Sequence, residues 1–211
     1  VKIWNGNASK EFKELNNLYY DDENDLGPIY GHQWRFYNAE YIDCHTDYSG
    51  KGIDQLQNII NNLKSDVKKT SRRLILCAWN PCQIQKMALP PCHILAQFHV
   101  TNENELSCTM YQRSCDMGLG VPFNIASYSF LTHLLAHHCG LKAKEFIYFL
   151  GNAHIYDDHI EQLGKQLSNL PLKFPKIHIK STYDDINLYS LEDIEISDYK
   201  HCETINMTMR N

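Results

Sequence analysis

The chain has 211 residues, of which 43% are hydrophobic and 21% charged, and its formal net charge is −5. This balance is typical of a globular protein with a sizeable core, and the negative charge argues against a general nucleic-acid-binding protein. No apolar run approaches the ~20 residues that span a bilayer, and nothing at the start resembles a signal peptide. Eight cysteines without a Cys-x-x-Cys pair indicate neither a small disulfide scaffold nor a zinc site, so we expect a reduced, cytoplasmic protein.

The first half of the chain predicts two helices and a strand. Residues 9–12 favour the start of a short helix, and residues 21–25 form an acidic loop. Apolar residues with helical spacing, at positions 56, 59, 60 and 63, predict a helix after Gly52. A basic connector at 64–73 ends in a pair of arginines, and residues 74–79 then have the composition of a buried strand.

The second half predicts a hairpin, a long helix and several short elements. In chain order these are a strand at 94–100, a polar turn at 102–104, a half-buried strand at 106–110, a helix at 125–139 that ends before Gly140, a short strand at 146–150, a helix up to Leu167, a strand around 177–179 and a polar tail from 193. Because helices and strands are interspersed, we expect an α/β protein, of the α+β type, with a mixed sheet.

Cys92 is the first candidate functional residue. Pro90 and Pro91 stand directly before it and a strand-like run follows, so Cys92 is expected at a stiff corner where a strand begins. His93 adds a titratable neighbour, and a thiol becomes a nucleophile where a nearby cation or donor favours the thiolate. The alternative is that Cys92 is one more small buried apolar residue, as most free cysteines are.

Arg113 is the second candidate, because it follows a predicted strand whose side chains are otherwise apolar or small. Its planar guanidinium suits a phosphate or a carboxylate. Ser114 adds a hydroxyl, and Gly118 and Gly120 allow close approach of the backbone, so this segment resembles an anion pocket. The alternative is an internal salt bridge with Asp116 as the partner.

Three further polar residues complete a set. Asn124 stands before a predicted helix, where it either caps the helix or offers a carboxamide to the edge of a heterocycle. His154 and Tyr156 lie two residues apart in an extended segment and can face one side, either as a core-edge pair or as ligands of hydroxyl groups. A thiol, an anion site, an amide and hydroxyl-binding groups together suit covalent chemistry on a nucleotide monophosphate.

Six stretches, in register along nearly the whole chain, closely resemble the thymidylate synthase family, the folate-dependent enzymes that make dTMP from dUMP. These stretches, closest to the eukaryotic type, are DLGPIYGHQWR, DQLQNII, SRRLILCAWNP, MALPPCH, ELSCTMYQRSCDMGLGVPFNIASY and GNAHIYDDHIEQL. The resemblance implies an α/β fold with a large mixed sheet flanked by helices, and a homodimer whose sheets pack back to back. It also implies one domain over residues 1–211 that lacks the family's N-terminal segment, which carries a further phosphate-binding arginine and a glutamate that orders water.

The resemblance implies a catalytic role for four residues. Cys92 is the expected nucleophile at carbon 6 of the uracil ring, after which carbon 5 attacks the methylene group of the folate. Asn124 is expected to hold the uracil edge and to help stabilise the oxyanion. Tyr30 is expected to assist removal of the proton from carbon 5, and His93 to order the water network.

The resemblance also implies the substrate contacts. The phosphate of dUMP is expected to bind Arg113 and Ser114, with Arg72 and Arg73 reaching it from the neighbouring subunit. For this arginine pair the alternative is a solvated loop before a strand. The other substrate-binding residues are Cys115 and Asp116, Asn124 at the base, and His154 and Tyr156 at the ribose hydroxyl.

The expected cosubstrate is 5,10-methylenetetrahydrofolate, which supplies both the one-carbon unit and the hydride, so no metal is expected. Asp116 is expected to hydrogen-bond the folate ring. Cys115 replaces the family's usual glycine, so its side chain is expected to crowd the pocket or to shift the backbone. The ending Arg210-Asn211 replaces a small and an apolar residue in the tail that folds over the folate. The residues expected to line the folate pocket are Trp79, Leu119, Gly120 and Phe123.

Three alternatives stay open at this point. A nucleotide hydroxymethylase of the same superfamily adds water where the synthase adds a hydride, although Asn124 favours uracil as the base and Trp79 favours hydride transfer. A truncated homologue could act without catalysis, as a dimerising scaffold or a regulator. The chain could also be the synthase part of a bifunctional dihydrofolate reductase–thymidylate synthase.

Overall fold

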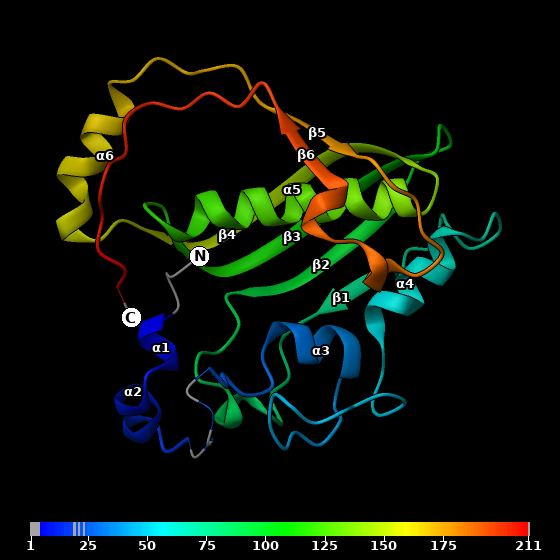
Figure 1. The fold of residues 1–211 in the computed structure, drawn as a ribbon, viewed down its shortest axis with the longest axis horizontal. Coiled ribbons are helices and arrows are strands. Elements are labelled where there is room, and N and C mark those ends of the chain that lie inside the picture. Colours follow the sequence, from blue (N-terminus) through cyan, green and yellow to red (C-terminus); the bar gives the residue numbers. More distant parts are fainter. Residues whose placement is uncertain (1–4, 19, 21, 23, 211) are drawn as a thin grey trace.

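A four-stranded mixed sheet forms the centre of the computed structural model, which describes residues 5–18, 20, 22 and 24–210 (Figure 1). The strand order is β1-β2-β3-β4, with β1–β2 and β2–β3 antiparallel and β3–β4 parallel. The strands are β1 (Ile75–Cys77), β2 (His93–Val100), β3 (Glu105–Asp116) and β4 (Lys142–His154). The predicted α/β class with a mixed sheet is therefore confirmed.

Helix α5 (Gly120–His138) connects the two parallel strands and packs against one face of the sheet (Figure 1). The hydrophobic core lies between them, where Phe98, Leu106, Met110 and Leu135 are completely buried. Helix α4 (Gln55–Leu63) closes the β1 end, and its four apolar residues at the predicted helical spacing are all buried. The spacing therefore predicted both this helix and its buried face.

The remaining elements are short. The helices are α1 (Asn5–Ala8), α2 (Lys10–Leu15), α3 (Tyr30–Phe36) and α6 (Ile160–Leu167), the 3₁₀ turns are η1 (Ile84–Lys86), η2 (Asp157–His159), η3 (Ile186–Leu188) and η4 (Leu191–Asp193), and β5 (Lys176–Ile179) pairs with β6 (Ile194–Ser197). Strand β6 falls in the tail from residue 193, for which the sequence analysis predicted no strand. Among the residues described, no helix has the length and apolar character needed to cross a membrane.

Two predicted boundaries near the candidate residues were wrong. Strand β3 runs to Asp116, so Arg113 lies inside the strand rather than after it, because β3 is paired on both edges and β4 follows it as far as His154. Helix α5 begins at Gly120, so Asn124 lies inside the helix and is not its N-cap. Strand β4 is likewise longer than the predicted 146–150, and β1 is shorter than 74–79.

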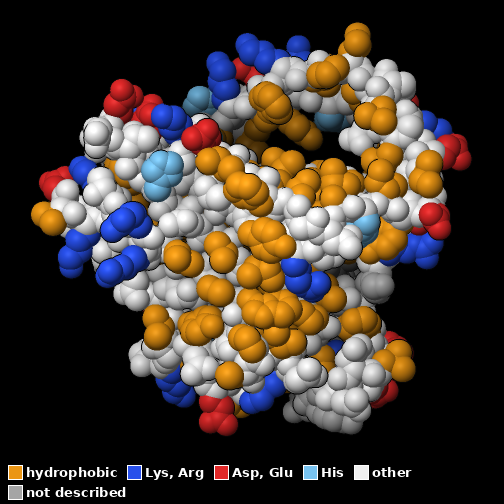
Figure 2. Space-filling model, turned by 180° about the vertical axis from the view of Figure 1, so that it is seen from behind, with side chains coloured by type: hydrophobic (Ala, Val, Ile, Leu, Met, Phe, Trp, Pro, Cys, Tyr) orange, Lys and Arg blue, Asp and Glu red, His pale blue; other side chains and the backbone are white. Residues whose placement is uncertain are grey.

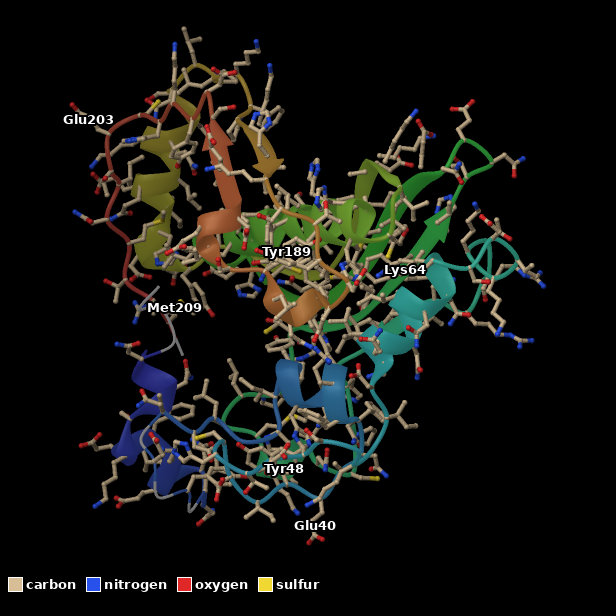
Figure 3. All side chains as sticks on the ribbon, turned by 45° about the vertical axis from the view of Figure 1, so that its right-hand side comes forward. Glu40, Tyr48, Lys64, Tyr189, Glu203 and Met209 are labelled. Carbon is tan, nitrogen blue, oxygen red and sulfur yellow. The ribbon has the colours of Figure 1, made fainter. Side chains whose placement is uncertain are left out.

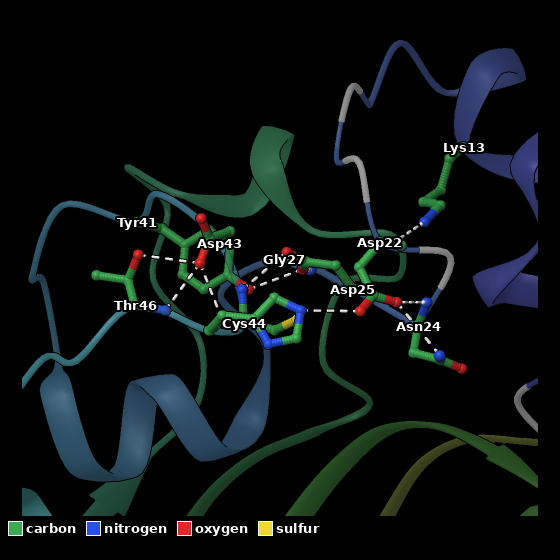
Figure 4. Close-up of polar contacts among 10 residues, drawn as sticks. Lys13, Asp22, Asn24, Asp25, Gly27, Tyr41, Asp43, Cys44 and Thr46 are labelled. Atoms are coloured by element: carbon green, nitrogen blue, oxygen red, sulfur yellow. Dashed lines mark hydrogen bonds and ion pairs between the residues drawn. The ribbon is translucent and has the colours of Figure 1, made fainter.

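A buried carboxylate holds the segment before α3. Asp25 is 1% exposed and accepts hydrogen bonds from the backbone N–H of Gly27 and Cys44 and from the hydroxyl of Tyr41 (Figure 4). Gly27 has φ +78°, and a Cβ at this position would collide with the carbonyl of Lys86. These contacts fix the entry into α3, whose first residue is Tyr30. The predicted acidic loop at 21–25 lies partly outside the described residues.

The sheet face opposite α5 carries exposed hydrophobic side chains. Two cross-strand rows face this side, and their exposed members are Ile75, Tyr111, Ile147 and Phe149. Figure 2, which views the molecule from behind, shows hydrophobic side chains concentrated at the centre of this face. We call these four residues the apolar sheet face.

We expect Leu63→Ala to lower the free energy of unfolding of the full-length protein by about 3 kcal/mol, because it leaves a cavity under α4. Leu167→Ala in α6 is the control, since Leu167 is 86% exposed and its loss is expected to cost less than about 0.5 kcal/mol. Urea denaturation followed by circular dichroism measures both. Equal losses would contradict the described position of the core.

Candidate functional site

A single cavity of about 230 Å³ brings together most of the residues predicted to act in one site. It lies where the ends of β3 and β4 meet the start of β2, α3 and α5. The predicted residues that line it are Tyr30, Cys92, His93, Arg113, Ser114, Asp116, Gly120, Asn124, His154 and Tyr156. Asn7, Leu89, Gln112, Met209 and Arg210 line it as well.

Cys92 stands directly before β2, at the predicted corner. Its backbone N–H donates to the hydroxyl of Tyr30 at 2.7 Å, and its carbonyl accepts from the backbone N–H of Arg113 at 2.9 Å. Burial raises the pKa of the Cys92 thiol above its usual value, while the positive charge of Arg113 and a hydrogen bond from Tyr30 oppose this rise. The thiol is therefore protonated in the free protein at neutral pH, with two groups beside it that favour the thiolate.

The guanidinium of Arg113 binds backbone carbonyls of the corner before Cys92 and not a carboxylate. Its Nε donates to the carbonyl of Pro91 at 2.9 Å and its Nη2 to the carbonyl of Pro90 at 2.8 Å. The guanidinium carbon also lies 5.6 Å from the ring centroid of Trp79. The alternative of an internal salt bridge to Asp116 is not what the structure shows. Because carbonyl oxygens do not neutralise the cation, Arg113 keeps its full positive charge at the cavity wall.

His93 and Asn124 form a buried hydrogen-bonded pair. Nδ2 of Asn124 lies 3.1 Å from Nε2 of His93, and Oδ1 of Asn124 accepts from Nε2 of Gln112 at 2.9 Å. His93 stacks on the ring of Tyr30 at a centroid distance of 4.2 Å. Burial lowers the pKa of His93 to about 4, so its imidazole is neutral at physiological pH.

Asp116 anchors the start of α5. Its carboxylate accepts hydrogen bonds from the backbone N–H groups of Gly118, Leu119 and Gly120 at 2.9–3.3 Å. Gly120 is the first residue of α5 and Leu119 is its N-cap, so the carboxylate satisfies N–H groups at the helix start that have no partner within the helix. The carboxylate therefore explains why the helix begins before Asn124, and its side chain still borders the cavity.

The C-terminal tail returns to the cavity. The imidazole of His159 is completely buried, and its Nε2 lies 2.7 Å from the carbonyl oxygen of Thr208. Arg210 donates to Asp158 at 3.1 Å and, like Met209, lines the cavity. Figures 1 and 3 show this end of the tail beside α1. Of the two residues that depart from the family's usual ending, Arg210 borders the cavity and Asn211 lies outside the described residues.

His154 and Tyr156 share one wall of the cavity, as their spacing predicted. Their rings meet edge to face at a centroid distance of 5.2 Å. His154 ends β4 opposite Asp116, with Nδ1 3.2 Å from the carbonyl of Asn152. A polar edge of the cavity therefore lies at the ends of the two parallel strands.

Several predicted residues do not line the cavity. Arg72 and Arg73 are exposed on the loop before β1. Cys115 is completely buried, with its thiol 3.5 Å from the carbonyl of Gln112, and the pairing of β3 with β4 continues through it, so it neither crowds the cavity nor shifts the register. Leu119 and Phe123 flank cavity residues at the start of α5, and Trp79 lies behind Arg113.

Two polar cavity residues, Gln112 and Asn7, were missed in the sequence. Gln112 continues the apolar positions 106, 108 and 110 along one face of β3, so a polar residue at a core-facing position was the available signal. Asn7 lies in α1, far from the other residues in sequence, and no local pattern marks it. Asn7 is 2% exposed, and neither polar atom of its side chain has a partner among the residues described.

Comparison with known proteins identifies relatives over the whole chain. The thymidylate synthase family model matches residues 1–211. The thymidylate synthase of Homo sapiens is 52% identical over 209 residues, covering 99% of this chain and 66% of that protein. The bifunctional dihydrofolate reductase-thymidylate synthases of Plasmodium berghei and Paramecium tetraurelia are 52% and 50% identical over 99% of this chain, which covers 35% and 44% of their lengths. The chain belongs to the thymidylate synthase family.

Proposed function

We propose that this protein catalyses the reductive methylation of dUMP to dTMP, with 5,10-methylenetetrahydrofolate as the donor of the methylene group and of the hydride. The observation that carries the proposal is the thiol of Cys92 and the guanidinium of Arg113 in the wall of one cavity. Family membership and the Asn124 carboxamide in the same cavity support it. The chain covers only part of its relatives' lengths, so the proposal concerns the protein of which this chain is part.

The first step is addition of the Cys92 thiolate to carbon 6 of uracil. In the free protein burial disfavours the thiolate, and the charge of Arg113 favours it. The same guanidinium is not neutralised by its partners, so it can also attract the phosphate of dUMP together with the Ser114 hydroxyl. His154 and Tyr156, on the opposite strand end, suit the ribose hydroxyl.

Addition at carbon 6 converts the ring into an enolate, and carbon 5 attacks the methylene group of the folate. Asn124 can stabilise the negative charge at oxygen 4 with its Nδ2–H, while neutral His93 supports this amide from behind. The proton on carbon 5 must then leave, and the Tyr30 hydroxyl lies in the cavity wall for this task. Loss of this proton breaks the bond between the methylene carbon and the folate nitrogen and leaves an exocyclic methylene group on the ring. Hydride transfer from the released tetrahydrofolate to this group then expels the Cys92 thiolate from carbon 6 and gives dTMP and dihydrofolate.

The folate is proposed to bind at the α5 side of the cavity. Asp116 borders this side, with Gly120 beside it and with Trp79, Leu119 and Phe123 as the apolar surroundings. The tail with Met209 borders the cavity beside α1 (Figure 3), and the α1 residue Asn7 lines the same cavity. The amide of Asn7, which has no partner among the described residues, is a further proposed folate contact.

We propose a homodimer formed through the apolar sheet face. The exposed apolar side chains on this face support it, since isolated soluble domains rarely leave such a patch uncovered. Arg72 and Arg73 are exposed on the loop at the sheet edge and free to reach a partner subunit's phosphate. The free state of all eight cysteines supports a reduced, cytoplasmic setting.

The full-length protein is expected to form a covalent adduct with fluoro-dUMP and methylenetetrahydrofolate, detected by intact mass and mapped to Cys92. Cys92→Ser is expected to abolish the adduct and to lower kcat at least about 10⁴-fold. Cys82→Ser, at an exposed cysteine, is the control, and this variant is expected to keep the adduct and the wild-type kcat. No adduct with wild type favours the non-catalytic alternative, and hydroxymethyl-dUMP without dihydrofolate identifies a hydroxymethylase.

Arg113→Gln is expected to raise the pKa of the Cys92 thiol further, because it removes the cation that favours the thiolate. The measurement is the pH profile of Cys92 alkylation, whose midpoint moves to higher pH. The variant should also weaken dUMP binding more than deoxyuridine binding. Lys165→Gln, which removes an equal charge from exposed α6, is the control. An unchanged or lower midpoint would contradict the role assigned to Arg113.

Asn7→Ala is expected to raise the KM for methylenetetrahydrofolate about 10-fold, because a buried amide loses its bonds to the ligand. The Kd for dUMP, measured without folate, should stay within about two-fold. Asn169→Ala, on the surface after α6, is the control and changes neither constant. A change confined to dUMP affinity would contradict the proposed contact of Asn7 with the folate and would indicate a contact with the nucleotide.

A further inference from the structure

We propose that Tyr148 is a positioning residue that fixes the orientation of the Asn124 carboxamide through Gln112, and thereby contributes to the preference for uracil over cytosine. This inference rests on the proposed function, because it concerns how the same cavity reads the base. Its basis is a chain of hydrogen bonds around the buried side chain of Gln112, whose own donors and acceptor can be assigned.

The amide of Gln112 has one orientation that satisfies all of its neighbours. Its Nε2 donates to the carbonyl of Ser114 at 2.8 Å and to Oδ1 of Asn124 at 2.9 Å, while its Oε1 accepts from the hydroxyl of Tyr148 at 2.6 Å. A carbonyl only accepts, so a reversed Gln112 amide would bring two acceptors together at Ser114. Gln112 is 2% exposed, so bulk water does not compensate for a lost partner.

Gln112 in turn determines which atom of Asn124 faces which neighbour. Because Gln112 donates, Asn124 turns Oδ1 toward it and Nδ2 toward Nε2 of His93. Each atom keeps one hydrogen-bonding direction for a ligand, an N–H on Nδ2 and a lone pair on Oδ1. Uracil presents a carbonyl and an N–H along its edge, whereas cytosine presents an amine and an unprotonated nitrogen. The observed orientation therefore suits uracil.

A reversed Asn124 carboxamide would suit cytosine, and Gln112 is the group that opposes it. After reversal, Nδ2 of Asn124 would face Nε2 of Gln112, and two donors would meet in a buried place. His93 does not oppose the reversal. Its neutral imidazole can carry the proton on either nitrogen, because the Tyr128 hydroxyl, 3.0 Å from Nδ1, can either accept or donate a hydrogen bond. Discrimination between uracil and cytosine therefore depends on the hydrogen bond between Gln112 and Asn124.

Aromatic packing holds the ring of Tyr148 in place, so that its hydroxyl stays directed at Gln112. Tyr148 lies on β4, where its ring stacks on Phe146 at a centroid distance of 5.2 Å, and Phe146 stacks on Tyr128 of α5 at 5.7 Å. This stack joins the strand to the helix that carries Asn124. Without the Tyr148 hydroxyl, Oε1 of Gln112 would be a buried acceptor without a partner, and orientations of Gln112 that release Asn124 would become populated.

The test is Tyr148→Phe in the full-length protein, which removes the hydroxyl and keeps the stacked ring. Calorimetric titration with dUMP and with dCMP gives the two dissociation constants. We expect dUMP to bind about five-fold more weakly, as one lost hydrogen bond predicts, while dCMP binding stays unchanged or improves. Tyr189→Phe is the matched control, since Tyr189 is also partly buried, its hydroxyl has no partner among the described residues, and it packs at the far end of α5 (Figure 3). Its dUMP-to-dCMP ratio should equal that of wild type.

Gln112 provides the second measurement. Gln112→Glu replaces the donor that faces Asn124 by an acceptor, and we expect it to shift the affinity ratio toward dCMP. In the Gln112→Met background, Tyr148→Phe should have no further effect on the ratio, because the hydroxyl acts through Gln112. Thermal unfolding of each variant separates lost folding from lost selectivity.

The outcomes distinguish this inference from the proposed function. Equal weakening of dUMP and dCMP binding by Tyr148→Phe, an unchanged ratio, or additive effects with Gln112→Met would overturn the role of Tyr148 while wild-type synthesis of dTMP stands. A wild-type protein that binds no dUMP would overturn both.

Discussion

Two hydrogen bonds from one guanidinium connect the chemistry of this protein to its sheet. Arg113 lies in the middle strand pair and donates to the carbonyls of Pro90 and Pro91, the residues that force the corner carrying Cys92. The thiol is thereby held at a fixed place relative to β3, and β3 carries the serine, the aspartate and the glutamine of the cavity. The same side chain places a positive charge beside a thiol whose pKa burial raises, and this charge opposes the rise. Arg113 therefore determines both the position of the Cys92 thiol and the positive charge beside it.

Much of this arrangement could be predicted where local chemistry decides it. The corner at Cys92 follows from two prolines, and the buried face of α4 follows from apolar spacing, so both were predicted before the structure was known. The length of β3 could not be predicted, because Gln112, Arg113 and Ser114 interrupt the apolar alternation and only pairing with β2 and β4 keeps them in the strand. The motifs identified the family, whereas spacing alone left each candidate residue with a plausible structural role.

The residues that were missed share one property. Asn7 and Gln112 contribute to the cavity only through tertiary contacts, and neither stands in a pattern typical of a functional residue. Asn7 comes from α1, which the fold brings beside the end of the tail (Figure 1). Gln112 is marked in the sequence only as a polar residue at a core-facing position, and its role follows from its partners Ser114, Asn124 and Tyr148. The role of a buried polar group can be inferred only from the groups that form hydrogen bonds with it.

The connection between the strands has a consequence for how the cavity assembles during folding. Strands β2 and β3 are joined by the tight turn at 101–104, so Cys92 and Arg113 belong to one hairpin and meet through contacts that close a short loop. His154 reaches the cavity through the parallel pairing of β4 with β3, and the connection between these two strands includes the whole of α5. Loop-closure entropy favours the first pairing over the second. The two halves of the cavity therefore differ in the length of chain that their pairing closes, which is short for the thiol and the guanidinium and long for the polar edge.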